Sequence, residues 1–250
     1  MITDSFDDKT PAIPSFSSFY GEQKRMIDIC LILFSKQIYD SVLEKIDCKK
    51  IAEIRACNGS TPIYQFTHNG LEIGFYLSMI GSACAAQLCI ESNWLTGATK
   101  YIMFGSAGSL DGEKTSGKFV IPTHAYRDEG MSYHYAPPTD YIEIRNHGRL
   151  AEIFRDLHLP YVEGKVWTTD AFMRETVGQT NLRKSEGCIA VEMELAGVQA
   201  VCDFTGLELY DFLATGDVLS KDEYRVEGLG DANHNMDKFY IALEIAQAIA

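Results

Sequence analysis

The chain has 250 residues, of which 46% are hydrophobic and 23% charged, a composition typical of a globular protein large enough for a well-buried core. Its formal net charge of −13 disfavours nucleic acid and anionic membranes as partners, because both are negatively charged. No apolar run reaches the ~18 residues that span a bilayer, and the polar, acidic N-terminus does not resemble a signal peptide. We therefore expect neither a nucleic-acid nor a membrane partner.

The cysteines favour a reducing compartment. All seven lie outside CxxC pairs, mostly among aliphatic residues, as is typical of buried free thiols in the cytoplasm. A zinc site needs Cys or His residues at close spacing, and the sequence lacks that spacing. We expect a cytoplasmic protein without a metal.

Residues 1–25 contain Ser, Asp and Pro without a regular period, and they are predicted to form an N-terminal arm before one domain at 26–250. Strands are expected at 26–34, 98–105, 116–122, 161–170 and 207–217, with two more at 61–78 around a His68-Asn69-Gly70 type I′ turn. Helices are expected at 35–46, 82–95, 151–159, 196–206 and 235–250. This alternation predicts an α/β fold with a twisted, largely parallel sheet.

Ligands of such sheets usually bind beyond the carboxyl ends of the strands. Gly105 to Ser109 follow one predicted strand and form either an ordinary tight turn or a turn whose N–H groups bind an anion. Phe172 follows another strand, either at the start of a helix or as a face that stacks on a flat ligand. Asp217 ends a third strand, either as a turn residue or as a buried carboxyl whose raised pKa lets it donate a proton.

The segment AVEMELAG, residues 190–197, carries two carboxylates within an apolar run. In a strand, or at a strand-to-helix junction, Glu192 and Glu194 face the same side. Buried carboxylates are costly unless they have partners, and a vicinal diol is a suitable partner because one carboxylate accepts from both hydroxyls. This pattern favours sugar recognition. The alternative is one solvent-facing glutamate and one ion-paired glutamate.

Together these segments resemble the phosphorylase superfamily that includes purine nucleoside phosphorylase, uridine phosphorylase and methylthioadenosine nucleosidase, over residues 27–247. FGSAGSL resembles the glycine-rich phosphate-side turn of the family, AVEMELAG its ribose-binding motif, and ATGD the segment with its catalytic aspartate. The resemblance implies a single-domain, three-layer α/β/α fold with a mixed sheet and a homodimer or larger homo-oligomer. It also implies a nucleoside substrate, inorganic phosphate as co-substrate, and no organic cofactor or metal.

The resemblance also assigns roles to individual residues. Asp217 is the general acid for the leaving base, and Phe172 stacks on that base. Glu194 binds the ribose hydroxyls, supported by Glu192 and Met193. The other implied site residues are Ile80 and Arg174 on the substrate side, and Gly105, Ser106 and Ala107 on the nucleophile side.

The chain departs from both family patterns. Phosphorolytic relatives carry an arginine where this chain has Met103, and others after the first strand, where it reads FSKQIYD; Arg174, Arg127 or Lys36 could compensate. Hydrolytic relatives carry a water-activating glutamate where this chain reads Gln37-Ile38. The leading hypothesis is phosphorolysis of a nucleoside, with a purine favoured and uridine possible. The alternatives are a phosphate-independent nucleosidase and a non-catalytic nucleoside-binding protein.

Overall fold

The structure is a computed structural model that describes residues 1–219 and 224–250. The strands of the described part are β1 (Ile29–Leu33), β2 (Lys49–Ala56), β3 (Gly59–His68), β4 (Leu71–Leu77), β5 (Lys100–Ser109), β6 (Phe119–Asp128), β7 (Tyr141–Glu143), β8 (Tyr161–Thr169), β9 (Cys188–Glu192), β10 (Glu208–Leu219) and β11 (Tyr224–Arg225). The α-helices are α1 (Phe16–Tyr20), α2 (Lys36–Lys45), α3 (Ser82–Thr96), α4 (Gly112–Thr115), α5 (His147–Asp156), α6 (Val177–Ser185), α7 (Leu195–Thr205), α8 (Leu229–His234) and α9 (Asp237–Ile249). Short 3₁₀ helices are η1 (Ile2–Asp4), η2 (Met131–His134) and η3 (Phe172–Arg174).

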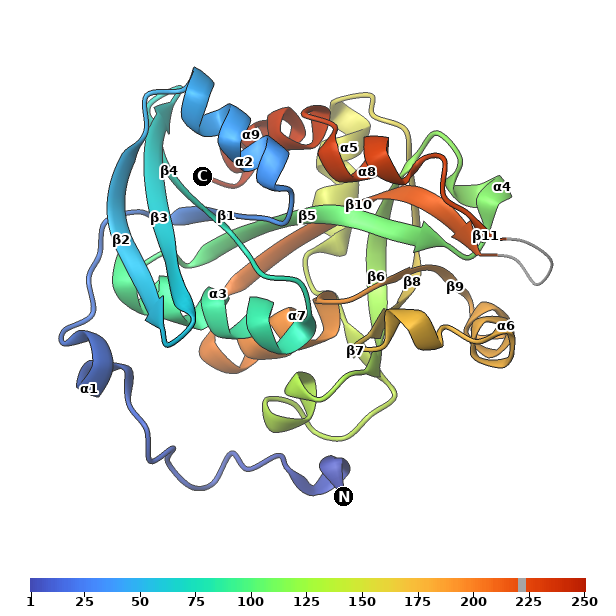
Figure 1. Cartoon of the computed structure of the whole chain (residues 1–250), viewed down its shortest axis with the longest axis horizontal. Helices are drawn as coiled ribbons and strands as arrows, with labels where there is room; N and C mark the ends of the chain where they lie inside the picture. The colour runs from blue at the N-terminus through green and yellow to red at the C-terminus, as the bar shows by residue number, and fades with distance from the viewer. Residues whose placement is uncertain (220–223) are drawn as a thin grey trace.

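The helices cover both faces of one mixed sheet, as the expected three-layer α/β/α fold requires. In Figure 1, α2, α5, α8 and α9 lie above the sheet and α3 and α7 lie below it. Alternate strand residues feed two cores, since Ile102 packs with the upper helices and Met103 with the lower ones. A strand that lies between the two helix layers is therefore apolar on both faces. This explains the short, continuous apolar runs of β1 and β5.

The strand order is β11-β10-β6-β8-β9-β5-β1-β4-β3-β2, with β7 beside β6. Because β10 also pairs with β5, the strands β5, β9, β8, β6 and β10 close into a ring. The pairs β1–β4, β1–β5, β5–β10, β6–β8 and β8–β9 are parallel, and β5–β9 and β6–β10 are antiparallel. The parallel strands β1, β5 and β10 thus end at the same edge of the sheet, where the candidate site residues were expected.

Local signals predicted several elements correctly. Asn69 and Gly70 both have positive φ, 48° and 83°, as the type I′ turn between β3 and β4 requires. Gly206, with φ of 73°, ends α7 as expected. Strand β2 was not expected, because its residues are largely exposed and polar. Helix α5 begins at His147, four residues before its predicted start.

The predicted turn at Gly105 to Ser109 is wrong, because these residues continue strand β5. Gly105, Ser106, Ala107 and Ser109 pair with β10, and Gly108 and Ser109 pair with β9. A Cβ on Gly108 would lie 2.7 Å from Leu219 Cδ1 and 3.0 Å from Val191 Cγ1. The small residues therefore allow three strands to meet closely, rather than making a turn. Strand β10 likewise runs past Asp217 to Leu219.

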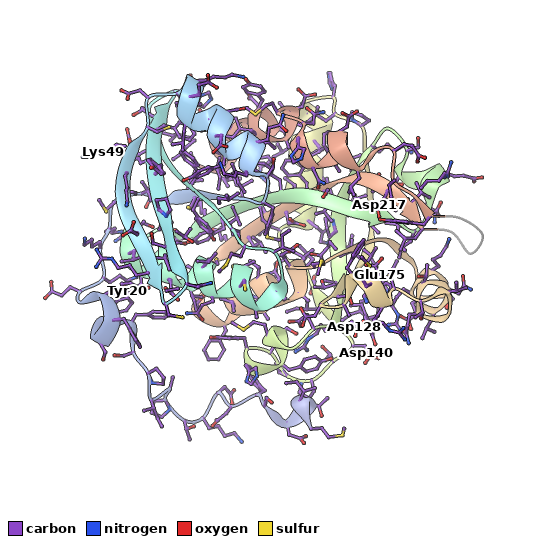
Figure 2. All side chains as sticks on the ribbon, viewed as in Figure 1. Tyr20, Lys49, Asp128, Asp140, Glu175 and Asp217 are labelled. Atoms are coloured by element: carbon purple, nitrogen blue, oxygen red, sulfur yellow. The ribbon has the colours of Figure 1, made fainter. Side chains whose placement is uncertain are left out.

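The N-terminal arm is largely exposed. The last part of the arm, around α1, packs against α3. The Phe16 and Trp94 ring centroids are 5.7 Å apart, and Trp94 Nε1 donates to the Gly21 carbonyl at 3.1 Å. The hydroxyl of Tyr20, labelled in Figure 2, donates to Glu91. No helix of the described residues is long and apolar enough to cross a membrane.

Candidate active site

A cavity of about 320 Å³ lies at the carboxyl ends of β5, β9 and β10, between these strands, α8 and the segment that contains η3. It brings together nine of the ten residues assigned to the site from the sequence: Ile80, Gly105, Ser106, Ala107, Phe172, Glu192, Met193, Glu194 and Asp217. Arg174 is exposed and does not line this cavity. Segments separated by more than 100 residues therefore converge on one site.

Glu192 supports the junction between β9 and α7. One of its carboxylate oxygens accepts from the backbone N–H groups of Glu194 and Leu195, both at 2.7 Å, and the other accepts from the Thr168 hydroxyl. These N–H groups have no partners within α7, so the carboxylate satisfies the start of the helix. Glu192 is 5% exposed, which excludes the solvent-facing alternative, and burial raises its pKa to about 8.

Glu194 lies two residues after Glu192 in the same junction between β9 and α7. Its Oε1 accepts from the Gly81 N–H at 2.7 Å, and its carbonyl accepts from the Ser82 hydroxyl at 3.3 Å. Ile80 and Met193 flank it on the cavity wall. Burial raises the pKa of Glu194 to about 7. A carboxylate held in this way can accept hydrogen bonds from adjacent hydroxyls of a ligand.

A second pair of carboxyls lines another part of the cavity. Asp217 on β10 is 4% exposed and accepts a hydrogen bond from Tyr224. Glu175 follows η3, and burial together with the charge of Asp217 raises its pKa to about 7. Figure 2 shows both side chains on the same side of the molecule. Phe172, 40% exposed, lies beside them and offers a ring face to a flat ligand.

Helix α8 closes the end of the cavity nearest β5. The Ser106 hydroxyl donates to the side chain of Asn233, and Ser35 Oγ lies 2.8 Å from His234 Nδ1. Lys238 Nζ donates to the carbonyls of Gly105 at 3.3 Å and Asn233 at 3.4 Å, and also to that of Ala232. Burial lowers the pKa of Lys238 to about 8. This end of the cavity therefore contains hydroxyl, amide and imidazole groups and one buried amine.

Met103 and Asp211 form the adjoining wall. They are register partners on β5 and β10, and both line the cavity. Asp211 is 1% exposed, and neither of its oxygens has a hydrogen-bond partner among the described residues. Burial, and then the charges of Glu192 and Glu194, raise the pKa of Asp211 well above its ordinary value. The cavity thus holds a carboxyl group that the protein itself leaves unpaired.

The three cations that the sequence suggested as replacements for the missing arginines lie outside this cavity. Arg127 is buried and donates to Ser132 at 2.8 Å and to backbone carbonyls between 136 and 139. Lys36 pairs with Asp40 at 2.5 Å on the exposed face of α2. In the part of the chain that the structure describes, no arginine lines the cavity. Among the described residues, no group of three or more His, Cys, Asp or Glu side chains is placed to hold a metal ion.

Residues 28–249 match the model of a known family, the phosphorylase superfamily. The chain belongs to this superfamily. It is 24% identical over 163 residues to guanosine phosphorylase of Halorubrum lacusprofundi, covering 62% of this chain and 65% of that protein. It is 26% identical over 223 residues to the DeoD-type purine nucleoside phosphorylase of Caldanaerobacter subterraneus subsp. tengcongensis, covering 86% of this chain and 90% of that one.

Solved structures share the superfamily fold with this chain. Native futalosine hydrolase of Helicobacter pylori strain 26695 superposes with a TM-score of 0.71 at 17% identity, covering 89% of this chain and 98% of that one. Helicobacter pylori MTAN gives a TM-score of 0.68 at 19% identity, covering 88% and 99%. At these identities the likeness shows the fold alone.

Sequence patterns missed several residues that line this cavity. Asp211 had a usable signal, because a carboxyl in the middle of the apolar run LYDFLAT requires an explanation. Glu175 lies three residues beyond Phe172, in a segment expected to start a helix, and the sequence assigned it no role. Asn233, His234 and Lys238 had no local signal, since only the packing of α8 and α9 against β5 brings them to the cavity.

Proposed function

We propose that this chain hydrolyses the N-glycosidic bond of a purine ribonucleoside. The observation that carries the proposal is the composition of the cavity, whose described lining includes five carboxyl groups and no arginine. A phosphate bound there would bring a negative charge that no arginine of the described lining neutralises, and it would repel each carboxyl that is ionised. Water is uncharged and incurs no such repulsion, so it is the nucleophile that suits this cavity.

The base-side residues suit a purine. Phe172 can stack on the fused rings, and Glu175 and Asp217 lie beside it. Because the pKa of Glu175 is raised to about 7, this carboxyl holds a proton near neutral pH. Transfer of that proton to N7 neutralises the negative charge that develops on the base as the bond breaks, and one such acid contributes about 10²–10⁴-fold to a rate.

The ribose site rests on Glu194. Its carboxylate, held by the Gly81 N–H, would accept hydrogen bonds from the 2′- and 3′-hydroxyls. Holding the sugar in this way fixes C1′ between the leaving base and the attacking water.

Phosphorolysis is the second candidate. It is favoured by Lys238, whose amine lies at the end of the cavity nearest β5, and by the two relatives named above as phosphorylases. However, three backbone carbonyls already accept from this amine. A phosphate would have to compete with them for the single buried amine.

An assay of nucleoside cleavage with and without phosphate tests the proposal. Purine, pyrimidine and 5′-methylthio nucleosides are incubated with the protein, and free base, free ribose and ribose 1-phosphate are measured. Free ribose released at a phosphate-independent rate is the expected result. Ribose 1-phosphate formed only with phosphate would establish phosphorolysis, and tight binding without turnover would establish a nucleoside-binding protein.

A further inference from the structure

Asp211 is the fourth of the 12 residues of β10 and is 1% exposed, yet neither carboxyl oxygen has a hydrogen-bond partner among the described residues. The two sequence neighbours, Tyr210 and Phe212, pack into the opposite core. The side chain of Asp211 therefore lies on the face of the sheet that carries the cavity, and it belongs to the cavity lining.

A buried carboxyl without partners lowers the stability of a fold, and an apolar residue of similar size would remove that cost. Two other carboxyls of the cavity have protein partners, since Glu192 accepts from backbone N–H groups and Glu194 accepts from the Gly81 N–H. The partner of Asp211 is therefore expected to be a molecule in the cavity. Residues kept at a cost to stability are typical of functional sites.

The neighbours of Asp211 indicate where in the cavity that molecule lies. Its register partner Met103 is 2% exposed and apolar, so it offers no hydrogen bond and no charge. The carboxyls whose charges act on Asp211 are those of Glu192 and Glu194, at the proposed ribose site. Asp211 thus lies on the cavity wall that β5 and β10 form, while Glu175 and Asp217 line the part of the cavity assigned to the base.

We propose that Asp211 is the general base that activates the attacking water, an inference that rests on the hydrolysis proposed above. As the bond between C1′ and the base nitrogen breaks, its electron pair moves to the base, and the Glu175–Asp217 pair protonates the base at N7. The water oxygen forms a bond to C1′ and transfers one proton to the Asp211 carboxylate. The products are free ribose and free base, and exchange with solvent returns a proton to the acid pair and removes one from Asp211.

The surroundings of Asp211 suit this role. Burial and the neighbouring carboxylates make its carboxylate a stronger base than that of an exposed aspartate. The positive charge that develops on the ribose during bond breaking favours the ionised form of Asp211 again. The unpaired oxygens leave a place for water to donate a hydrogen bond.

The test compares Asp211→Asn and Asp211→Ala with a matched control, Asp203→Asn. Asp203 lies outside the cavity, and its carboxylate has protein partners, Gln199 at 2.8 Å and Arg145 at 2.9 Å. Free ribose release is measured without phosphate, and Tm is measured for each protein. Asp211→Asn is expected to lower kcat by about 10²–10⁴-fold with an unchanged or higher Tm. Asp203→Asn is expected to lower Tm and leave kcat unchanged.

Chemical rescue distinguishes a base from a residue that only shapes the cavity. Azide and formate are small enough to fit the space that Asp211→Ala leaves. Either reagent is expected to restore part of the activity of this variant. With azide, the expected product is a ribosyl azide. Near wild-type kcat in Asp211→Asn, or a fall in both kcat and Tm without rescue, would overturn the role of Asp211 while leaving hydrolysis standing. A wild-type protein that cleaves nucleosides only with phosphate would overturn hydrolysis itself, and with it this inference.

Discussion

The Glu194 carboxylate accepts a hydrogen bond from the Gly81 N–H at 2.7 Å, although the two residues are 113 positions apart in the chain. The bond joins the start of α7 to the start of α3. Because Ile80 and Met193 are the adjacent residues, it also brings together the two chain segments on either side of the proposed sugar site. The ribose site is therefore a product of long-range packing as well as of the AVEMELAG motif.

Glu194→Ala tests the proposed diol contact. Hydrogen bonds to a charged group contribute about 1.5–3 kcal/mol, so kcat/KM for ribonucleosides is expected to fall roughly 10–100-fold. The 2′-deoxy analogues already lack one of the two hydroxyls and should lose less. Steady-state kinetics on matched ribo- and deoxyribonucleosides measure the difference. Equal losses on the two series would contradict the diol role.

Asp217→Asn removes the proposed acid from the base side. The rate of hydrolysis of ordinary purine nucleosides is expected to fall about 10²–10⁴-fold. A nucleoside methylated at N7 carries a positive charge on its base and leaves without protonation, so its cleavage should be much less affected. Comparison of kcat for the two substrates in wild type and variant is the measurement. A uniform loss on both would assign Asp217 to binding instead of proton transfer.

Glu175→Gln should change how stability depends on pH. The pKa of Glu175 is about 7 in the folded protein, above the ordinary 4.5, so the folded state binds the proton more tightly than the unfolded state does. Its contribution to stability is present at low pH and is lost as the pH rises through about 7. Urea unfolding between pH 4.5 and 8 is expected to show a smaller fall for the variant than for the wild type. Identical pH profiles would exclude a raised pKa at this residue.

Gly108→Ala tests the close meeting of β5, β9 and β10. The added methyl would lie 2.7 Å from Leu219 Cδ1, so we expect a loss of about 1–3 kcal/mol in the free energy of unfolding. Gly148, on α5, is the matched control, because a Cβ there meets no atom within 4 Å. Gly148→Ala should stabilise the helix by about 0.5–1 kcal/mol. Denaturant titrations measure both, and a neutral Gly108→Ala would contradict the packing argument.

Lys238→Met tests the anchoring of α8. The thioether matches the length of the lysine stem but leaves the carbonyls of Gly105, Ala232 and Asn233 without their donor, at a cost of about 1–3 kcal/mol. Hydrogen exchange of α8 amides should accelerate. Lys36→Met is the control, since its exposed ion pair contributes less than about 1 kcal/mol. If the two variants lose equal stability, the amine of Lys238 does not hold α8.

Much of the fold could be predicted because its signals are local. The positive φ at Asn69 and Gly70 follows from two adjacent residues, and the end of α7 from Gly206 alone. The Glu192–Glu194 pair was found for the same reason, since both side chains belong to one short segment. By contrast, the strand conformation of Gly105 to Ser109 depends on β9 and β10, which come from distant parts of the chain. Lys238 reaches the site only because the first turn of α9 folds back to donate to carbonyls of α8 and β5, which local composition does not reveal.

The closed ring of β5, β9, β8, β6 and β10 constrains how a substrate reaches the site. Glu192, Asp211 and Asp217 stand on strands of this ring, and hydrogen bonds run around it without an edge at which two lobes could hinge apart. The spacing between the carboxyl groups on these strands is therefore set when the protein folds, before any ligand arrives. Opening and closing of the site therefore depend on short segments outside the ring, namely α8 and the segment around Glu175. We therefore expect product release to depend on motions of a few residues instead of domain rotation.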